Sequence, residues 1–188
     1  MKNDIYALLG AVLAICAYVP YLLAIARKEI KPAASSWLVW TMLTLLTVVS
    51  ASKAGNVYPQ MYAYLILDPL VMITGLIMKQ WNRFTLLDWI CIIIGGIGGI
   101  VYFISPSFSL IASIVAVTIS TIPTIRNVYL KPEDENKLGW ILFTLAGTFS
   151  LLSAIINFTS VIDLAAPISY FSTCFIVTVL LYRKQYKS

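Results

Sequence analysis

The sequence contains no histidine among its 188 residues. This absence excludes a Ser-His-Asp triad, a metal held by imidazole groups and a histidine proton relay. The three cysteines, Cys16, Cys91 and Cys174, lie in separate apolar runs, and an odd number cannot close a full set of disulfides. We interpret them as small apolar packing residues. We expect no metal site and no other cofactor.

Charge is also scarce, since charged residues make up 11% of the chain and apolar residues 60%. A soluble domain usually carries about a quarter charged residues to cover its surface. The composition therefore excludes an ordinary soluble enzyme, a disordered tail and a nucleic-acid-binding module, despite the net charge of +5. It indicates a protein whose solvent is the lipid bilayer, and we expect no nucleic acid among its partners.

Long apolar runs are what the sequence has in abundance. A bilayer core about 30 Å thick requires roughly 20 apolar residues per helix. Breaks rich in Pro, Gly, Asn or charge separate seven such runs, which are Ile5–Ala26, Ser36–Ser52, Pro59–Met78, Leu86–Ile104, Phe108–Leu130, Leu138–Phe158 and Ile162–Tyr182. They predict an all-α transmembrane fold of seven helices.

Basic residues predict the orientation of these spans, because lysine and arginine near helix ends stay on the cytoplasmic side. Eleven of the thirteen follow the first, third, fifth or seventh span, namely Arg27, Lys28, Lys31, Lys79, Arg83, Arg126, Lys131, Lys137, Arg183, Lys184 and Lys187. The N-terminus is thus expected outside and the C-terminus in the cytoplasm. We expect a multi-pass protein of a prokaryotic inner membrane.

The chain carries an internal duplication. A shift of 103 residues places identical residues on one another at Pro20 and Pro123, Lys28 and Lys131, Trp37 and Trp140, Thr41 and Thr144, Ser50 and Ser153, and Ala51 and Ala154. A shift of 98 residues places Pro69 on Pro167. Spans one to three therefore repeat as spans five to seven, in two parallel units at residues 1–82 and 107–188.

The fourth span, within residues 83–106, is predicted to link the two units and to restore the direction of the second. Its run Gly95-Gly96-Ile97-Gly98-Gly99 contains a GxxxG pattern, which lets a neighbouring helix approach closely. One chain already holds both units, so a cavity does not require a second copy. The sequence leaves a homo-oligomer open.

Two stretches one repeat apart carry a resemblance to a known family. Residues 17–37 read AYVPYLLAIARKEIKPAASSW, and residues 120–140 read STIPTIRNVYLKPEDENKLGW. Each has a proline near the end of a span, then a basic loop, then a tryptophan that opens the next span. This pattern resembles the PQ-loop superfamily, which includes the SWEET (MtN3) and SemiSWEET sugar transporters and the related bacterial transporters of nicotinamide riboside.

The chain departs from that family pattern in two ways. Tyr21 and Thr124 stand where the motif has glutamine, and the repeated prolines lie in spans one, three, five and seven. In SWEET proteins the prolines lie in spans one, two, five and six. The chain looks closest to a bacterial branch whose members are mostly uncharacterised. The resemblance implies hinges at Pro20, Pro69, Pro123 and Pro167, where a proline removes a backbone hydrogen bond. The alternative is that membrane helices simply tolerate these prolines.

Asp68 is the outstanding candidate for a functional residue, because it lies near the middle of the third span. A carboxylate at that depth must face a cavity, bind a partner or be protonated. It could contact a substrate or carry a proton, or it could cap a half-helix that begins at Pro69. Tyr64 lies one turn earlier on the same face.

Other candidates for a cavity are aromatic or carry hydroxyl groups. They are Trp40, Thr44, Thr144, Ser169, Tyr170 and Thr173. An indole ring can stack on a base or a sugar face. Trp37 and Trp140 are interpreted as aromatic-belt residues at the inner interface, and the run Glu133-Asp134-Glu135 as a solvated loop.

These observations favour a membrane transporter of a small polar solute that works by alternating access and is not an enzyme. The solute would be a sugar or a vitamin- or nucleoside-like molecule, and transport would be facilitated or proton-coupled. The alternative is a membrane receptor or interaction protein on the same fold that does not transport.

Overall fold

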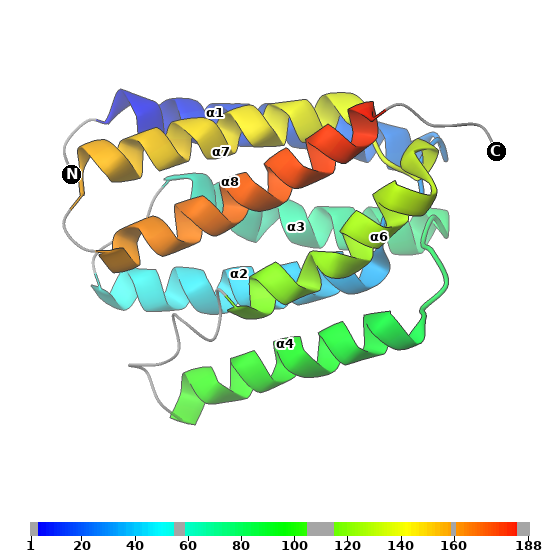
Figure 1. Ribbon diagram of the computed structural model, residues 1–188, viewed down its shortest axis with the longest axis horizontal. Coiled ribbons are helices and arrows are strands. Elements are labelled where there is room, and N and C mark those ends of the chain that lie inside the picture. The colour runs from blue at the N-terminus through cyan, green and yellow to red at the C-terminus, as the bar shows by residue number, and fades with distance from the viewer. Residues whose placement is uncertain (1–3, 55–58, 105–114, 159–160, 184–188) are drawn as a thin grey trace.

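The computed structural model describes residues 4–54, 59–104, 115–158 and 161–183. These residues form α-helices and one short 3-10 helix, and none of them forms a strand (Figure 1). The elements are α1 (Ile5–Ala26), α2 (Ala34–Ala54), α3 (Pro59–Met78), α4 (Leu86–Ile104), α6 (Ile122–Leu130), η1 (Pro132–Asp134), α7 (Lys137–Ile156) and α8 (Val161–Tyr182).

Four of these helices are long and apolar enough to cross a membrane, namely α1, α3, α7 and the stretch Leu164–Tyr182 of α8. Shorter apolar stretches occupy Ala34–Val49 in α2 and Leu86–Gly98 in α4. The outer surface of the bundle is apolar, and side chains such as Ile66 and Ile77 are exposed on it. Such a surface is what a bilayer solvates, so the prediction of a helical membrane protein is supported.

Local signals explain the ends of several helices. Asp4 caps α1 by accepting a hydrogen bond from the backbone N–H of Tyr6 at 3.0 Å. The Asn136 side chain caps α7 in the same way, through the N–H of Gly139 at 2.7 Å. After α1 and α3, Lys28 and Lys79 adopt positive φ values of 61° and 55°, the left-handed conformation that commonly ends a helix.

The predicted fifth span differs from the structure. Residues 115–120 are helical, Thr121 forms a turn, and α6 then begins at Ile122, so the described part of the span is interrupted. Pro123 provides the reason, since it has no N–H to donate to the carbonyl of Ile119 four residues earlier, and a proline ring clashes with that carbonyl in a continuous helix. Residues 108–114 of the predicted span lie outside the described residues.

We call α1, α2 and α3 the first triplet and α6, α7 and α8 the second triplet. In the first, α3 contacts both α1 and α2; in the second, α8 contacts both α7 and α6. The triplets meet where α1 packs against α7 and where α2 packs against α6. Helix α4 lies at the edge of the bundle beside α2 (Figure 1). There a Cβ on Gly95 would stand 2.5 Å from a methyl carbon of Val39, so α2 approaches α4 closely at this one glycine of the predicted run.

Several loops meet at one end of the bundle, where α1, α3 and α6 end and α2, α4 and α7 begin. The N–H of Lys31 donates to the carbonyl of Asp134 at 3.0 Å, and the Asn82 side chain donates to the carbonyl of Lys31 at 2.8 Å. We call this the basic end, because its loops expose Arg27, Lys28, Lys31, Lys79, Arg83 and Lys131. The other end is called the opposite end.

Candidate functional site

A cavity of about 50 Å³ lies inside the bundle, where the two triplets meet. Its wall comes from α1, α2, α3, the helical residues 115–120, α7 and α8. The lining residues are Tyr18, Trp37, Trp40, Thr44, Tyr64, Asp68, Val117, Trp140, Phe143, Tyr170, Thr173 and Cys174. The wall therefore combines seven aromatic rings with one carboxylate and no basic side chain.

Asp68 projects into this wall from α3 and is 5% exposed. Its Oδ1 accepts a hydrogen bond from the Tyr18 hydroxyl of α1, and its Oδ2 accepts one from Thr44 Oγ1 of α2 at 3.1 Å. Each carboxylate oxygen therefore has a donor from a different helix. Hydrogen bonds to a carboxylate are among the strong ones in proteins, so Asp68 ties three helices together.

The alternative interpretation of Asp68 as a helix cap is wrong. Helix α3 runs without interruption from Pro59 to Met78, and Pro69 lies inside it. No half-helix begins at Pro69, so Asp68 caps nothing. Its hydrogen bonds go instead to side chains of neighbouring helices.

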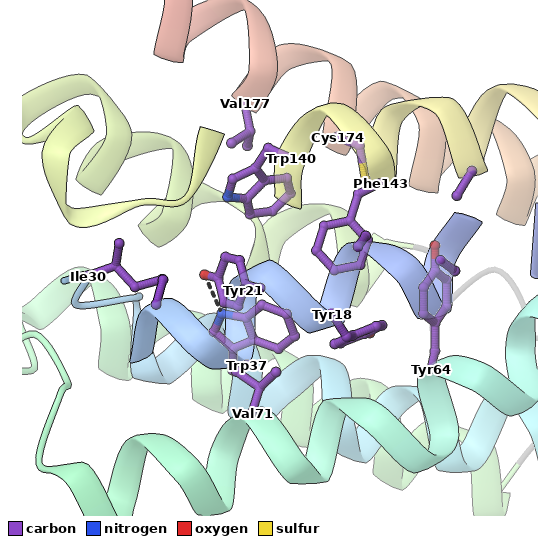
Figure 2. Close-up of a cluster of buried hydrophobic side chains, with 14 of the residues drawn as sticks. Tyr18, Tyr21, Ile30, Trp37, Tyr64, Val71, Trp140, Phe143, Cys174 and Val177 are labelled. Carbon is purple, nitrogen blue, oxygen red and sulfur yellow. Dashed lines mark hydrogen bonds between the residues drawn. The ribbon is translucent and has the colours of Figure 1, made fainter. Parts of the chain in front are cut away.

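The aromatic side chains of the wall pack edge to face. The ring centroids of Tyr18 and Phe143 lie 4.9 Å apart, and those of Trp37 and Trp40 lie 5.2 Å apart. Trp40 also contacts Trp140, with centroids 6.4 Å apart. These distances are typical of favourable aromatic pairs. Figure 2 shows that rings from both triplets meet around this centre.

A polar cluster closes the cavity toward the basic end. The Tyr21 hydroxyl donates to Glu135 Oε2 at 2.6 Å, and Trp140 Nε1 donates to the same oxygen at 2.8 Å. Trp37 Nε1 donates in turn to the Tyr21 hydroxyl at 3.3 Å. In Figure 2 the Tyr21 ring lies between the indoles of Trp37 and Trp140. The cluster joins α1 and α2 to the loop before α7.

Glu135 itself corrects an expectation, because the loop acid predicted to be solvated is 4% exposed. Burial raises the pKa of Glu135 from 4.5 to about 7, although the hydrogen bonds from Trp140 and Tyr21 act in the opposite direction. Its Oε1 atom is buried without a hydrogen-bond partner. Trp37 and Trp140, interpreted from the sequence as belt residues, are each only 2% exposed and belong to the core.

A pair of tyrosines stands on the other side of the cavity. The rings of Tyr64 and Tyr170 have centroids 5.4 Å apart, and Gln60 donates a hydrogen bond to the Tyr64 hydroxyl. Both tyrosines also line a second cavity of about 20 Å³ near the opposite end. Ala166, which a shift of 98 residues places on Asp68, lies in that second wall. The tyrosine pair therefore stands between the two cavities.

The structure brings most of the predicted site residues together. Asp68, Tyr64, Trp40, Thr44, Tyr170 and Thr173 all line the central cavity. Two candidates are absent from its wall and have other partners. The Thr144 hydroxyl donates to the Trp140 carbonyl at 2.8 Å, and Ser169 Oγ lies 3.0 Å from Thr118 Oγ1.

The four predicted hinge prolines have different surroundings. Pro20, Pro69 and Pro167 lie inside continuous helices. Pro123 is the one of the four next to a helix interruption, and hydrogen bonds tie that interruption to α8. Thr121 Oγ1 lies 3.2 Å from Thr173 Oγ1, for example.

Sequence reasoning overlooked several residues of the site. Tyr18, Trp37, Trp140 and Phe143 line the cavity, and Glu135 accepts a hydrogen bond from Trp140 of its wall. One signal for part of this set was present, since a shift of 103 residues places Trp37 on Trp140. No signal in the local sequence distinguishes Glu135 from its acidic neighbours.

Among the residues that the structure describes, no group of three or more His, Cys, Asp or Glu side chains could hold a metal ion. Comparison with known proteins found no matching family model, no matching curated protein and no matching solved structure.

Proposed function

We propose that the chain is a membrane transporter of a small polar solute that works by alternating access. The observation that carries this proposal is the position of the cavity. It lies between the two helix triplets, holds a buried carboxylate, and has side-chain clusters on both sides. A binding site between two units that can rock against one another is the common plan of secondary transporters.

The packing of the triplets supports the proposed duplication of three helices, one linker helix and three helices. In each triplet the third helix contacts both the first and the second. The first helix of each triplet also packs against the second helix of the other, as α1 does with α7 and α6 with α2. A two-fold axis along the bundle would produce this pattern, and the resemblance to PQ-loop proteins implies the same arrangement.

The same proposal assigns the basic end to the cytoplasm and the opposite end to the exterior, through the accumulation of exposed lysine and arginine. The Tyr21–Glu135 cluster would then be the inner closure, and the Tyr64–Tyr170 pair the outer one. Alternating access requires one closure to open while the other stays shut. The interruption next to Pro123 provides a place where the second triplet can bend.

The solute class follows first from the resemblance, which favours a sugar or a vitamin- or nucleoside-like molecule. Transport would be facilitated, or coupled to protons through Asp68, which costs energy when it is charged and buried. Proton coupling predicts that uptake depends on pH and on a proton gradient. Equal uptake by the wild type and Asp68→Asn at every pH would contradict the coupled version.

Reconstitution into proteoliposomes tests the transport proposal directly. Uptake of labelled sugars, nucleosides, vitamins and amines would be measured for the wild type, Asp68→Asn and Asp88→Asn. Asp88 is a matched control, since it is also buried but lies on α4 and bonds to Thr85 and Ser35 outside the cavity. We expect uptake to be lost in Asp68→Asn and kept in Asp88→Asn.

One observation favours the second candidate, a receptor that binds a solute without moving it. The cavity of about 50 Å³ has room for only a few water-sized groups, so the centre of the bundle is nearly packed. A receptor would bind its solute to purified protein and show no flux in vesicles. Saturable uptake into the same vesicles would exclude this candidate.

A further inference from the structure

The central cavity has an unbalanced charge. Asp68 is the one ionisable carboxylate in its wall, and the wall contains no lysine or arginine. The basic side chains of the loops are exposed at the basic end, away from Asp68. A buried carboxylate in an apolar bundle favours a cation nearby, because the attraction between opposite charges is strong where water is excluded.

The aromatic part of the cavity wall is also suited to a positively charged solute. Seven aromatic rings surround the cavity, and three of them belong to Trp37, Trp40 and Trp140. Aromatic rings attract cations through the negative potential of their faces, tryptophan most of all, and cages of such rings bind ammonium groups. A carboxylate together with several rings therefore offers an ammonium ion both a charge and a polarisable wall.

The wall is poorly equipped for a polyhydroxylated solute. The Tyr18 and Thr44 hydroxyls donate to Asp68, and the Tyr64 hydroxyl accepts from Gln60. Thr173 is within hydrogen-bond distance of Thr121. Each hydroxyl of a buried sugar needs a partner, and most polar groups of this wall already have one. An anionic solute would meet Asp68 without a compensating positive charge.

We propose that the solute of this cavity is a small organic cation, a methylated amine or quaternary ammonium ion, held by Asp68 and the aromatic wall. This inference rests on the proposed transport function and departs from the sugar that the resemblance favours. A cavity of about 50 Å³ accepts a few water-sized groups, so methylammonium fits it without rearrangement. Larger ions such as choline require the closures to move apart.

Pairs of solutes with the same shape and different charge test the inference in the wild-type protein. Choline would be compared with its uncharged analogue 3,3-dimethylbutan-1-ol, and methylammonium with methanol. Binding would be measured on purified protein by competition against labelled choline, and uptake would be measured in proteoliposomes. We expect each cation to bind at least tenfold more tightly than its uncharged partner, which corresponds to about 1.4 kcal/mol.

Two variants, each with a matched control, test whether the preference for cations depends on Asp68 and on Trp40. Asp68→Asn should lose the preference for the cation, whereas Asp88→Asn should keep it. Trp40→Leu should weaken choline binding several-fold, whereas Trp89→Leu, on the exposed face of α4, should not. The comparison of charged and uncharged solutes needs no variant, so the inference stays testable if Asp68→Asn does not fold.

The outcomes separate this inference from the transport proposal. Uptake of the uncharged solutes or of sugars, without binding of either cation, would overturn the inference and leave the transporter proposal standing. Binding of the cations without uptake would support the inference and favour a receptor. Neither binding nor uptake of any tested solute would overturn both.

Discussion

Replacing Glu135 by glutamine should change how the stability of the protein depends on pH. The Glu135 carboxyl is buried between Tyr21 and Trp140, and burial raises its pKa from 4.5 to about 7. Between these two pH values the folded protein holds a proton that the unfolded chain releases. The contribution of Glu135 to the free energy of unfolding therefore decreases as the pH rises from about 4.5 to about 7 and is constant above that range.

The size of the effect follows from the same pKa. A rise from 4.5 to about 7 corresponds to about 3 kcal/mol, at about 1.4 kcal/mol per pH unit. Glutamine keeps a side-chain oxygen for the hydrogen bonds from Tyr21 and Trp140 and removes the charge. Above pH 7 we therefore expect Glu135→Gln to be more stable than the wild type, by up to about 3 kcal/mol.

Thermal unfolding of purified protein, followed by tryptophan fluorescence between pH 4.5 and 8.5, would measure this difference. The quantity to compare across pH is the Tm of Glu135→Gln minus the Tm of the wild type. Every other ionisable group titrates in both proteins, so its effect cancels in this difference. Glu133→Gln is the matched control, since Glu133 is exposed in the same loop. Parallel Tm curves for Glu135→Gln and the wild type would refute the reasoning.

Further predictions concern the helices. Gly95→Ala should lower stability by about 1–3 kcal/mol through overpacking against Val39, whereas Gly96→Ala, whose Cβ meets nothing within 4 Å, should raise it by up to about 1 kcal/mol; thermal unfolding distinguishes them. Lys79→Gly should raise stability by about 1 kcal/mol in the same assay, because glycine adopts φ 55° without strain. Pro123→Ala should lower the initial uptake rate at least several-fold while circular dichroism stays unchanged or gains helix; unchanged uptake would contradict a hinge there.

The ends of most helices could be predicted from the sequence, because charge and capping residues bound the apolar runs. The predicted bounds of α1, α3 and α4 agree with the structure. The interruption at Thr121 could not be predicted in this way. A shift of 103 residues places Pro20 on Pro123, yet α1 continues through Pro20. At the interruption, Thr121 Oγ1 lies 3.2 Å from Thr173 Oγ1 of α8, a contact that the local sequence does not predict.

A residue of the site could be predicted from the sequence where its chemical type stands out from that of its neighbours in the chain. Asp68 stands out, since it is the carboxylate in the middle of an apolar run. Tyr18 does not, because a tyrosine in a membrane helix is ordinary until a hydrogen bond gives it a role. Glu135 lies between charged and polar neighbours that predict a solvated loop, and only the packing of the loop against Tyr21 and Trp140 buries it.

Helix α1 supplies a hydrogen-bond donor to each of the two buried carboxylates of the site, Asp68 and Glu135. Tyr18 donates to Asp68 in the cavity, and Tyr21 donates to Glu135 at the basic end. Residues three apart share one face of a helix, so α1 cannot shift or rotate without changing both contacts. A solute that displaces Tyr18 from Asp68 would thereby also strain the closure at Glu135. Alternating access needs such a coupling, because a solute can shift an equilibrium between closed and open forms only through contacts that differ between them.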